Sequence, residues 1–156
     1  MAIVYRYCRR DELYTVGSES SGRHTVANNT PAYVSSAKNL GAESATKLME
    51  VTIWLQLHNR SEFDALTQSL YDRTSPEYHH WLKASDIATR FAPTAQEAKI
   101  VQEFMAGHNL TVMKVGPNNF YVRARGTVAD VQNAFQVQFN NYQVGGKTIR
   151  ANASDP

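Results

Sequence analysis

His79 and His80 are the first candidates for a chemical site, because imidazole is a common ligand of zinc. Adjacent residues on a helix, however, point about 100° apart, so they do not share one metal ion easily. The sequence offers no further Cys or His at a spacing typical of zinc ligands. We therefore expect no metal site and no cofactor.

Acid–base and nucleophilic chemistry have equally weak candidates. Asp64 and Asp72 are predicted to lie on a helix surface, where carboxylates are usually solvated. The sequence contains no Gly-x-Ser-x-Gly motif, no glycine-rich phosphate loop and no Cys–His arrangement. Gly107 and Gly116 are better explained as a helix stop and a turn. The pattern favours a domain that works by binding, not by catalysis.

The elements that must position any binding residues begin with a strand at residues 50–58. Apolar and other side chains alternate there, which predicts one buried face. Three possible N-cap residues, each followed by apolar residues at helical spacing, predict three helices that begin at Ser61, Ser85 and Thr94.

Residues 110–115 and 120–125 are two short β-prone runs joined by the turn residues Gly116-Pro117-Asn118-Asn119, which predicts a hairpin. A capped helix is expected to begin at Thr127, followed by a last strand that ends near Tyr142. Gly145-Gly146 indicates a turn, so residues 147–150 are predicted to return as an extra edge strand.

This order of elements predicts an α+β fold of the ferredoxin-like, split β-α-β type. Its four-stranded antiparallel sheet would carry helices on one face and leave the second face open. Trp, Tyr and Arg dominate binding hot spots, and they are frequent among the expected occupants of that face. A solvated face with a few tolerated aromatic side chains is the alternative. The expected occupants are Trp54, Gln56, Tyr121, Arg123, Arg125, Gln138 and Tyr142.

Charge and hydropathy narrow the class of partner. The chain has 156 residues, with 16 Lys and Arg against 14 Asp and Glu. A net charge of +2 is too small for the basic patch of a typical nucleic-acid binder. In the 120–125 strand only Tyr121 would offer a stacking ring to RNA. No apolar run is long enough for a signal peptide or a membrane span, so we expect neither nucleic acid nor a membrane as partner.

Composition also suggests how the chain is divided. Residues 17–30 are rich in Ser, Asn and Gly and offer little to bury, so they do not offset the entropy of ordering a chain. We expect residues 1–30 to be a mobile tail or an extension foreign to the native protein. Residues 31–150 should form one domain, and residues 151–156 should begin a linker.

Two stretches carry recognisable motifs, Ser75-Pro76-Glu77-Tyr78-His79-His80-Trp81-Leu82 and Arg90-Phe91-Ala92-Pro93-Thr94. They resemble the S-P-x-Y-x-x-W/Y-L-T and R-F-x-P-T signatures of the pro-kumamolisin activation domain, the N-terminal propeptide of the sedolisin family of serine-carboxyl peptidases. Residues 55–60, 107–112 and 126–135 resemble further stretches of that family in the same order. The chain departs from the family at Lys83, where Thr is usual, and at Ile87, where an aromatic is usual.

The resemblance implies a propeptide that acts as an intramolecular chaperone and as an active-site inhibitor of a secreted or periplasmic endopeptidase until acid triggers its removal. The family's catalytic Ser, Glu and Asp belong to the mature peptidase and are absent here, so the chain alone should be an inactive monomer whose partner is the peptidase domain in cis. The expected peptidase interface is Trp54, Gln56, Tyr121, Arg123, Arg125 and Tyr142. The expected segment in the active-site cleft is Arg150, Ala151, Asn152, Ala153, Ser154, Asp155 and Pro156.

Two further hypotheses concern the trigger and the motif aromatics. Imidazoles that gain charge in mild acid could act as the trigger, and the candidates are His58, His79, His80 and His108, with interface carboxylates as the alternative. Tyr78, Trp81 and Phe91 are interpreted as a small satellite core rather than as contact residues. The alternative function is a free-standing protein-binding or protease-inhibitor module.

Overall fold

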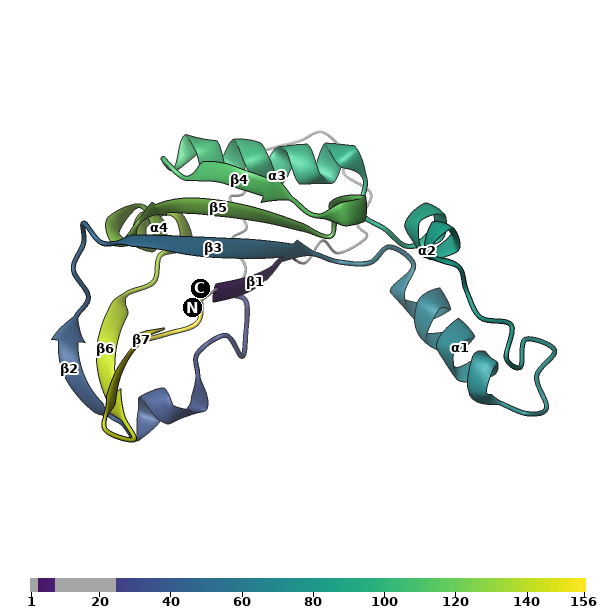
Figure 1. Cartoon of the computed structure of the whole chain (residues 1–156), viewed down its shortest axis with the longest axis horizontal. Coiled ribbons are helices and arrows are strands. Elements are labelled where there is room, and N and C mark those ends of the chain that lie inside the picture. Colours follow the sequence, from purple (N-terminus) through teal and green to yellow (C-terminus); the bar gives the residue numbers. More distant parts are fainter. Residues whose placement is uncertain (1–2, 8–24) are drawn as a thin grey trace, which may run out of the picture.

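The computed structural model describes residues 3–7 and 25–156 and has an α+β architecture, as the sequence predicts (Figure 1). Most of the expected tail, residues 1–30, therefore lies outside the described residues. The strands are β1 (Ile3–Tyr7), β2 (Lys38–Ala42), β3 (Leu48–Leu55), β4 (Thr111–Val115), β5 (Tyr121–Thr127), β6 (Phe139–Val144) and β7 (Lys147–Asn152). The α-helices are α1 (Arg60–Tyr71), α2 (Ala84–Arg90), α3 (Ala95–Gly107) and α4 (Val128–Phe135). Short 3-10 turns span Ala32–Ser35 and Pro117–Asn119.

The larger sheet has the strand order β1-β3-β5-β4. Strands β3, β5 and β4 pair antiparallel, and β4 and β5 form the predicted hairpin. Strand β1 pairs parallel with β3 and occupies its other edge. The register between β4 and β5 shifts between Val112 and Lys114, so the edge strand β4 is irregular.

The predicted four-stranded antiparallel sheet is not confirmed, because the last strand of that prediction belongs elsewhere. Strand β6 is the centre of a second sheet with the order β2-β6-β7. The edge of β3 that β6 would have used carries β1 instead. Gln136 ends α4 in a left-handed conformation, with φ of 53°, and after this turn β6 pairs with β2 and β7. The predicted return strand is confirmed as β7.

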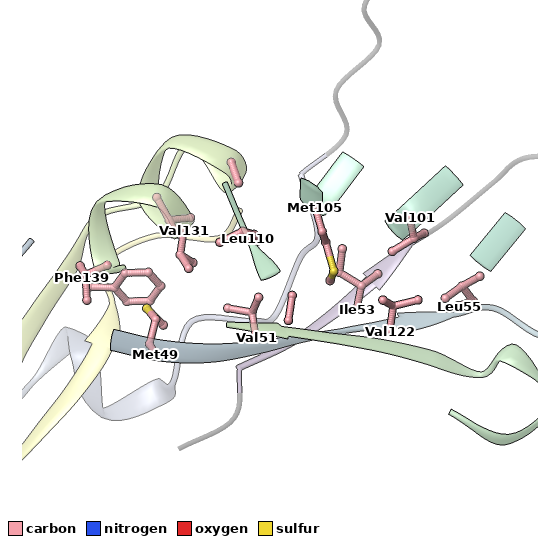
Figure 2. Packing of buried hydrophobic residues seen from close by; sticks show 14 of the residues in the cluster. Met49, Val51, Ile53, Leu55, Val101, Met105, Leu110, Val122, Val131 and Phe139 are labelled. Atoms are coloured by element: carbon pink, nitrogen blue, oxygen red, sulfur yellow. The ribbon is translucent and has the colours of Figure 1, made fainter. Parts of the chain in front are cut away.

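The core lies between the larger sheet and helices α3 and α4. Apolar side chains from β3 point toward the helices, as Figure 2 shows for Val51, Ile53 and Leu55 against Val101 and Met105. Burying such aliphatic side chains contributes about 1.5–3 kcal/mol each. The alternation that predicted one buried face of β3 is therefore confirmed at these positions.

Two helix starts agree with the sequence and two do not. Thr94 and Thr127 are the N-caps of α3 and α4, and each forms a reciprocal capping box. Helix α1 starts earlier than Ser61, after Asn59 in a left-handed conformation. Helix α2 also starts before its predicted cap, because the Asp86 carboxylate accepts the N–H of Lys83.

Helices α1 and α2 form a lobe that projects from the end of the molecule opposite the second sheet (Figure 1). Phe91 is fully buried at its base and lies edge-on against Phe63, with ring centroids 5.2 Å apart. The carbonyl of Phe91 accepts the N–H of His58 at 2.9 Å. These contacts join the lobe to the end of β3.

Candidate docking face

The face of the larger sheet that points away from α3 and α4 carries three cross-strand pairs. We call it the open face and define it by Glu50, Thr52, Trp54, Tyr121, Arg123 and Arg125. In the register of β3 and β5, Trp54 lies opposite Tyr121, Thr52 opposite Arg123, and Glu50 opposite Arg125. Side chains of directly opposed residues on one face touch, so the six residues form a continuous strip.

The first pair is aromatic. The rings of Trp54 and Tyr121 are 4.9 Å apart between centroids and are tilted by 52°. Trp54 is 40% exposed and lies near the end of the central strand β3. Such a pair offers a large apolar contact with polar tips, which is the chemistry of a protein-binding hot spot.

The second pair contains polar atoms without partners. The hydroxyl of Thr52 and the Nε of Arg123 are buried, and neither makes a hydrogen bond with any described residue. The guanidinium of Arg123 lies 5.9 Å from the centroid of the Tyr121 ring, so a cation–π contact orients it. An unpartnered buried polar atom costs about 1–3 kcal/mol, which makes this pair the least satisfied point of the strip.

The third pair is ionic. Arg125 donates from Nη2 to a carboxylate oxygen of Glu50 at 2.5 Å. This hydrogen bond and the charge of Arg125 hold the pKa of the Glu50 carboxyl below its usual value. Both side chains are partly exposed, so the pair fixes geometry more than it adds stability. With Arg125 paired in this way, Arg123 is the cation of the open face that forms no salt bridge with a described residue.

Sequence reasoning missed some residues beside these pairs. Glu50 and Thr52 continue the alternation of Trp54, so extending that pattern toward the strand's start would have found them. Lys114 lies opposite Arg123 in the register of β4 and is exposed. The register shift in β4 places Lys114 opposite Arg123, and no pattern in the sequence predicts such a shift.

The structure brings together four of the six predicted interface residues, Trp54, Tyr121, Arg123 and Arg125. Gln56 is exposed just beyond the end of β3. The placement of Tyr142 is wrong, because it is only 3% exposed and pairs with Ile149 inside the second sheet. Gln138 is exposed before β6 begins and is likewise not part of the larger sheet.

The predicted linker is not featureless. Arg150, Ala151 and Asn152 belong to β7, and the last two are buried. These three residues are well ordered because β7 pairs with the central strand β6, and the pairing provides hydrogen-bond partners for the backbone of β7. Of the remaining residues, Ala153, Asp155 and Pro156 bond to segments far away in the chain, and the Ser154 carbonyl accepts from the nearby Asn152 side chain.

The four histidines lie away from the open face. His58 Nε2 is 2.8 Å from a carboxylate oxygen of Glu97, and His108 Nδ1 is 2.8 Å from the Phe104 carbonyl oxygen. His79 stacks on Tyr78 in the lobe, and His80 lies 3.9 Å from Glu77. Each histidine already has a neighbour within this chain.

Other chemical candidates have structural roles. Asp64 accepts from Arg60 and Asp72 accepts from Thr74, both on exposed parts of the lobe. Among the described residues, no group of His, Cys, Asp and Glu side chains could hold a metal ion. No helix in that part of the chain has the length and apolar character needed to cross a bilayer.

The satellite core interpretation holds for Phe91 but fails for Trp81. Trp81 is 57% exposed and meets Tyr71, itself 69% exposed, with ring centroids 5.4 Å apart. The turns between α1 and α2 leave these rings on the lobe's surface, where His79 also stacks against Trp81.

Comparison with known proteins places this fold in a family. The family described as Pro-kumamolisin, activation domain, matches residues 35–156. The chain belongs to this family. The match includes all six residues of the open face and all seven residues of the expected cleft segment.

A curated relative of this activation domain is Sedolisin from Pseudomonas sp. (strain 101), which is 25% identical over 146 residues. The alignment covers 88% of this chain but 25% of the relative. The activation domain therefore spans about a quarter of the length of the curated relative that it matches.

Proposed function

We propose that this activation domain is the propeptide of a secreted serine-type (serine-carboxyl) endopeptidase and acts as its intramolecular chaperone and active-site inhibitor. The observation that carries the proposal is the family match over residues 35–156. The small share of Sedolisin that the chain covers supports a peptidase domain in cis as the partner. Catalysis belongs to that domain, and this chain supplies binding.

The open face is the proposed docking surface. Its aromatic pair consists of the exposed Trp54 and the half-buried Tyr121, and it lies beside the guanidinium of Arg123. Fully desolvated aromatic and Arg side chains at the centre of an interface typically lose about 2 kcal/mol or more of binding free energy when truncated. A partner that covers the strip and offers a carboxylate to the half-buried Arg123 side chain would pair its charge.

The C-terminal segment is the proposed inhibitory element. Residues 153–156 leave β7 beyond its last paired residue, Asn152, and they have the composition of an extended chain with little to bury. Such a segment can lie at a peptidase cleft and be cut there as a substrate-like strand once its own hydrogen bonds open.

Acid removal is the third part of the proposal, and carboxylates are the better candidates for the trigger. Burial alone would raise the pKa of Glu97, but hydrogen bonds from Thr94 and His58 together hold it below its usual value. The hydroxyl of Thr127 and its backbone N–H lower the pKa of Asp130. Both groups stabilise helix starts while ionised, and that stability is lost as pH falls through their lowered pKa values. Acid would thus loosen the domain that docks.

The test is inhibition in trans of a mature sedolisin-type peptidase by the purified chain, titrated from near-neutral to acidic pH. Tight inhibition that weakens on acidification supports the propeptide. Trp54→Ala and Arg123→Ala should each weaken inhibition at least about tenfold, as hot-spot truncations do.

Trp81→Ala is the matched control, because it removes an exposed Trp that lies on the lobe and not on the open face. It should inhibit as the unsubstituted chain does. Absence of inhibition at every pH would reject the propeptide and favour a free-standing binding module. Inhibition that survives both open-face substitutions would reject the open face as the dock.

A further inference from the structure

Asp155 joins the C-terminal segment of the chain to residues 28–30. Its carboxylate accepts the backbone N–H groups of Asn28, Asn29 and Thr30 at 2.8, 2.9 and 2.6 Å. The Thr30 hydroxyl adds a fourth hydrogen bond at 2.8 Å. Asp155 is thus bound by residues that precede it by 125 to 127 positions.

The backbone of residues 28–30 forms a small anion cradle. Asn28 has a φ of 64°, in the left-handed region, and this turns the successive N–H groups toward one point. Concave arrangements of successive N–H groups bind anions through their partial positive charge. The described donors to Asp155 include no Lys, Arg or His, so the backbone and one hydroxyl hold its charge.

A second set of bonds secures the same contact. Asn152 is 2% exposed, and its Nδ2 donates to the Ser154 carbonyl at 2.8 Å and to the Thr30 hydroxyl at 3.3 Å. The Thr30 hydroxyl therefore links Asn152 to Asp155. The N–H of Val26 donates to the carbonyl of Pro156 at 2.7 Å.

We propose that residues 26–30 and 152–156 form a latch, in which the Asp155 carboxylate seated on the N–H groups of residues 28–30 keeps both segments closed to proteolysis. A peptidase hydrolyses a peptide bond only when several residues around it can leave their own contacts and extend into its cleft. The bonds to residues 153–156 oppose this, including the one from the Ala153 N–H to the Gln138 carbonyl at 2.8 Å. Figure 1 shows the C-terminal end turning from β7 toward the middle of the molecule rather than away from it.

The charge of Asp155 decides whether the latch holds. The hydrogen bond from the Thr30 hydroxyl and those from the N–H groups lower the pKa of the Asp155 carboxyl. The ionised form is therefore favoured in the closed latch. Closure is complete above the ordinary pKa of an aspartate and is lost as pH falls through the lowered value. Local opening then precedes unfolding of the sheet.

The latch adds detail to the proposed function and rests on that function in one respect. In a propeptide, the latched segment is the one that is expected to be cut. The latch is nevertheless measured on the isolated chain without any peptidase partner. Failure of the inhibition test and failure of the latch are thus separate results.

The first experiment compares Asp155→Ala with the unsubstituted chain by amide hydrogen exchange and by limited digestion with proteinase K at neutral pH. Asp155→Ala should speed cleavage within residues 25–30 or 153–156 on the order of tenfold, because all four bonds to the carboxylate are lost. Amides of residues 28–30 should lose protection while the Val122 amide in β5 keeps it. Asp64→Ala, which removes an exposed carboxylate from α1, should change neither.

Cleavage and protection that match the unsubstituted chain would overturn the latch. If Asp155→Ala unfolds the whole domain, the decisive measurement is exchange of the unsubstituted chain as pH is lowered. The latch requires residues 28–30 to lose protection at a pH where Val122 remains protected. Loss of both at the same pH would overturn it.

Discussion

Tyr121 lies directly over the backbone of Gly116, so that no larger residue fits beneath its ring. A Cβ built at Gly116 would be closer than 3.0 Å to three ring carbons of Tyr121. The N–H of Gly116 also donates to the Tyr121 carbonyl at 2.7 Å. The turn between β4 and β5 thus fixes the ring that meets Trp54 on the open face.

Gly116→Ala should therefore displace Tyr121 and disturb the open face. Overpacking of this kind typically lowers the free energy of unfolding by about 1–3 kcal/mol. The expected result in denaturant unfolding is a lower midpoint, together with weaker inhibition of the peptidase in trans.

Gly107→Ala is the matched control for this prediction. Gly107 ends α3 without a positive φ, and a Cβ added there would meet no atom within 4 Å. Exchanging Gly for Ala in a helix typically adds about 0.5–1 kcal/mol of stability. If the two substitutions changed the unfolding midpoint and the inhibition equally, the Tyr121 ring would be free to move away from residue 116.

Glu97 should make the stability of the domain depend on pH. Its carboxylate accepts the N–H and the hydroxyl of Thr94, and it lies 2.8 Å from His58 Nε2. These contacts lower its pKa despite burial. The stabilisation, on the order of 1 kcal/mol for a capping box, is present above the ordinary pKa of glutamate and is lost as pH falls through the lowered value.

Glu97→Gln should thus reduce stability at neutral pH and flatten the acid side of the stability curve, as measured by urea unfolding at several pH values. Glu103→Gln removes an exposed carboxylate from the same helix and should follow the unsubstituted chain. A curve for Glu97→Gln that stays parallel to the unsubstituted one would exclude Glu97 from acid destabilisation.

Local signals in the sequence predicted the parts of the fold that depend on neighbouring residues. Thr94 and Thr127 cap helices through bonds to residues three positions later. Val51, Ile53 and Leu55 are buried because alternation in a strand sets the face. The same alternation of side chains correctly placed Trp54 and Tyr121 on the open face.

Pairings between distant residues could not be predicted in this way. The sequence predicts Tyr142 on the open face because the alternation of side chains does not reveal which strand will pair with the strand that carries Tyr142. Its sheet is completed by β2, whose residues are exposed throughout and show no apolar alternation. The contact of Asp155 with Thr30 spans 125 residues and depends on the backbone conformation of Asn28.

Phe91 should hold the α1 and α2 lobe to the rest of the domain. It is fully buried, and its ring meets Phe63 at the base of the lobe. Phe91→Ala leaves a cavity there and should lower the free energy of unfolding by about 3–5 kcal/mol. Hydrogen exchange should show the greater loss of protection in α1 and α2. An equal loss in β5 would mean that the lobe and the sheet unfold as one unit.

Tyr142→Ala should mainly lower stability, whereas Trp54→Ala should mainly weaken binding. Tyr142 is 3% exposed inside the second sheet, so its truncation should lower the free energy of unfolding by about 3 kcal/mol. Trp54 is 40% exposed, and its truncation should cost much less stability.

For inhibition in trans, the relative size of the two effects should reverse. Under conditions where each variant is folded, as checked by circular dichroism, Tyr142→Ala should inhibit like the unsubstituted chain and Trp54→Ala should be weaker by about tenfold or more. Weakened inhibition by folded Tyr142→Ala would return Tyr142 to the interface and move the dock from the open face toward the second sheet.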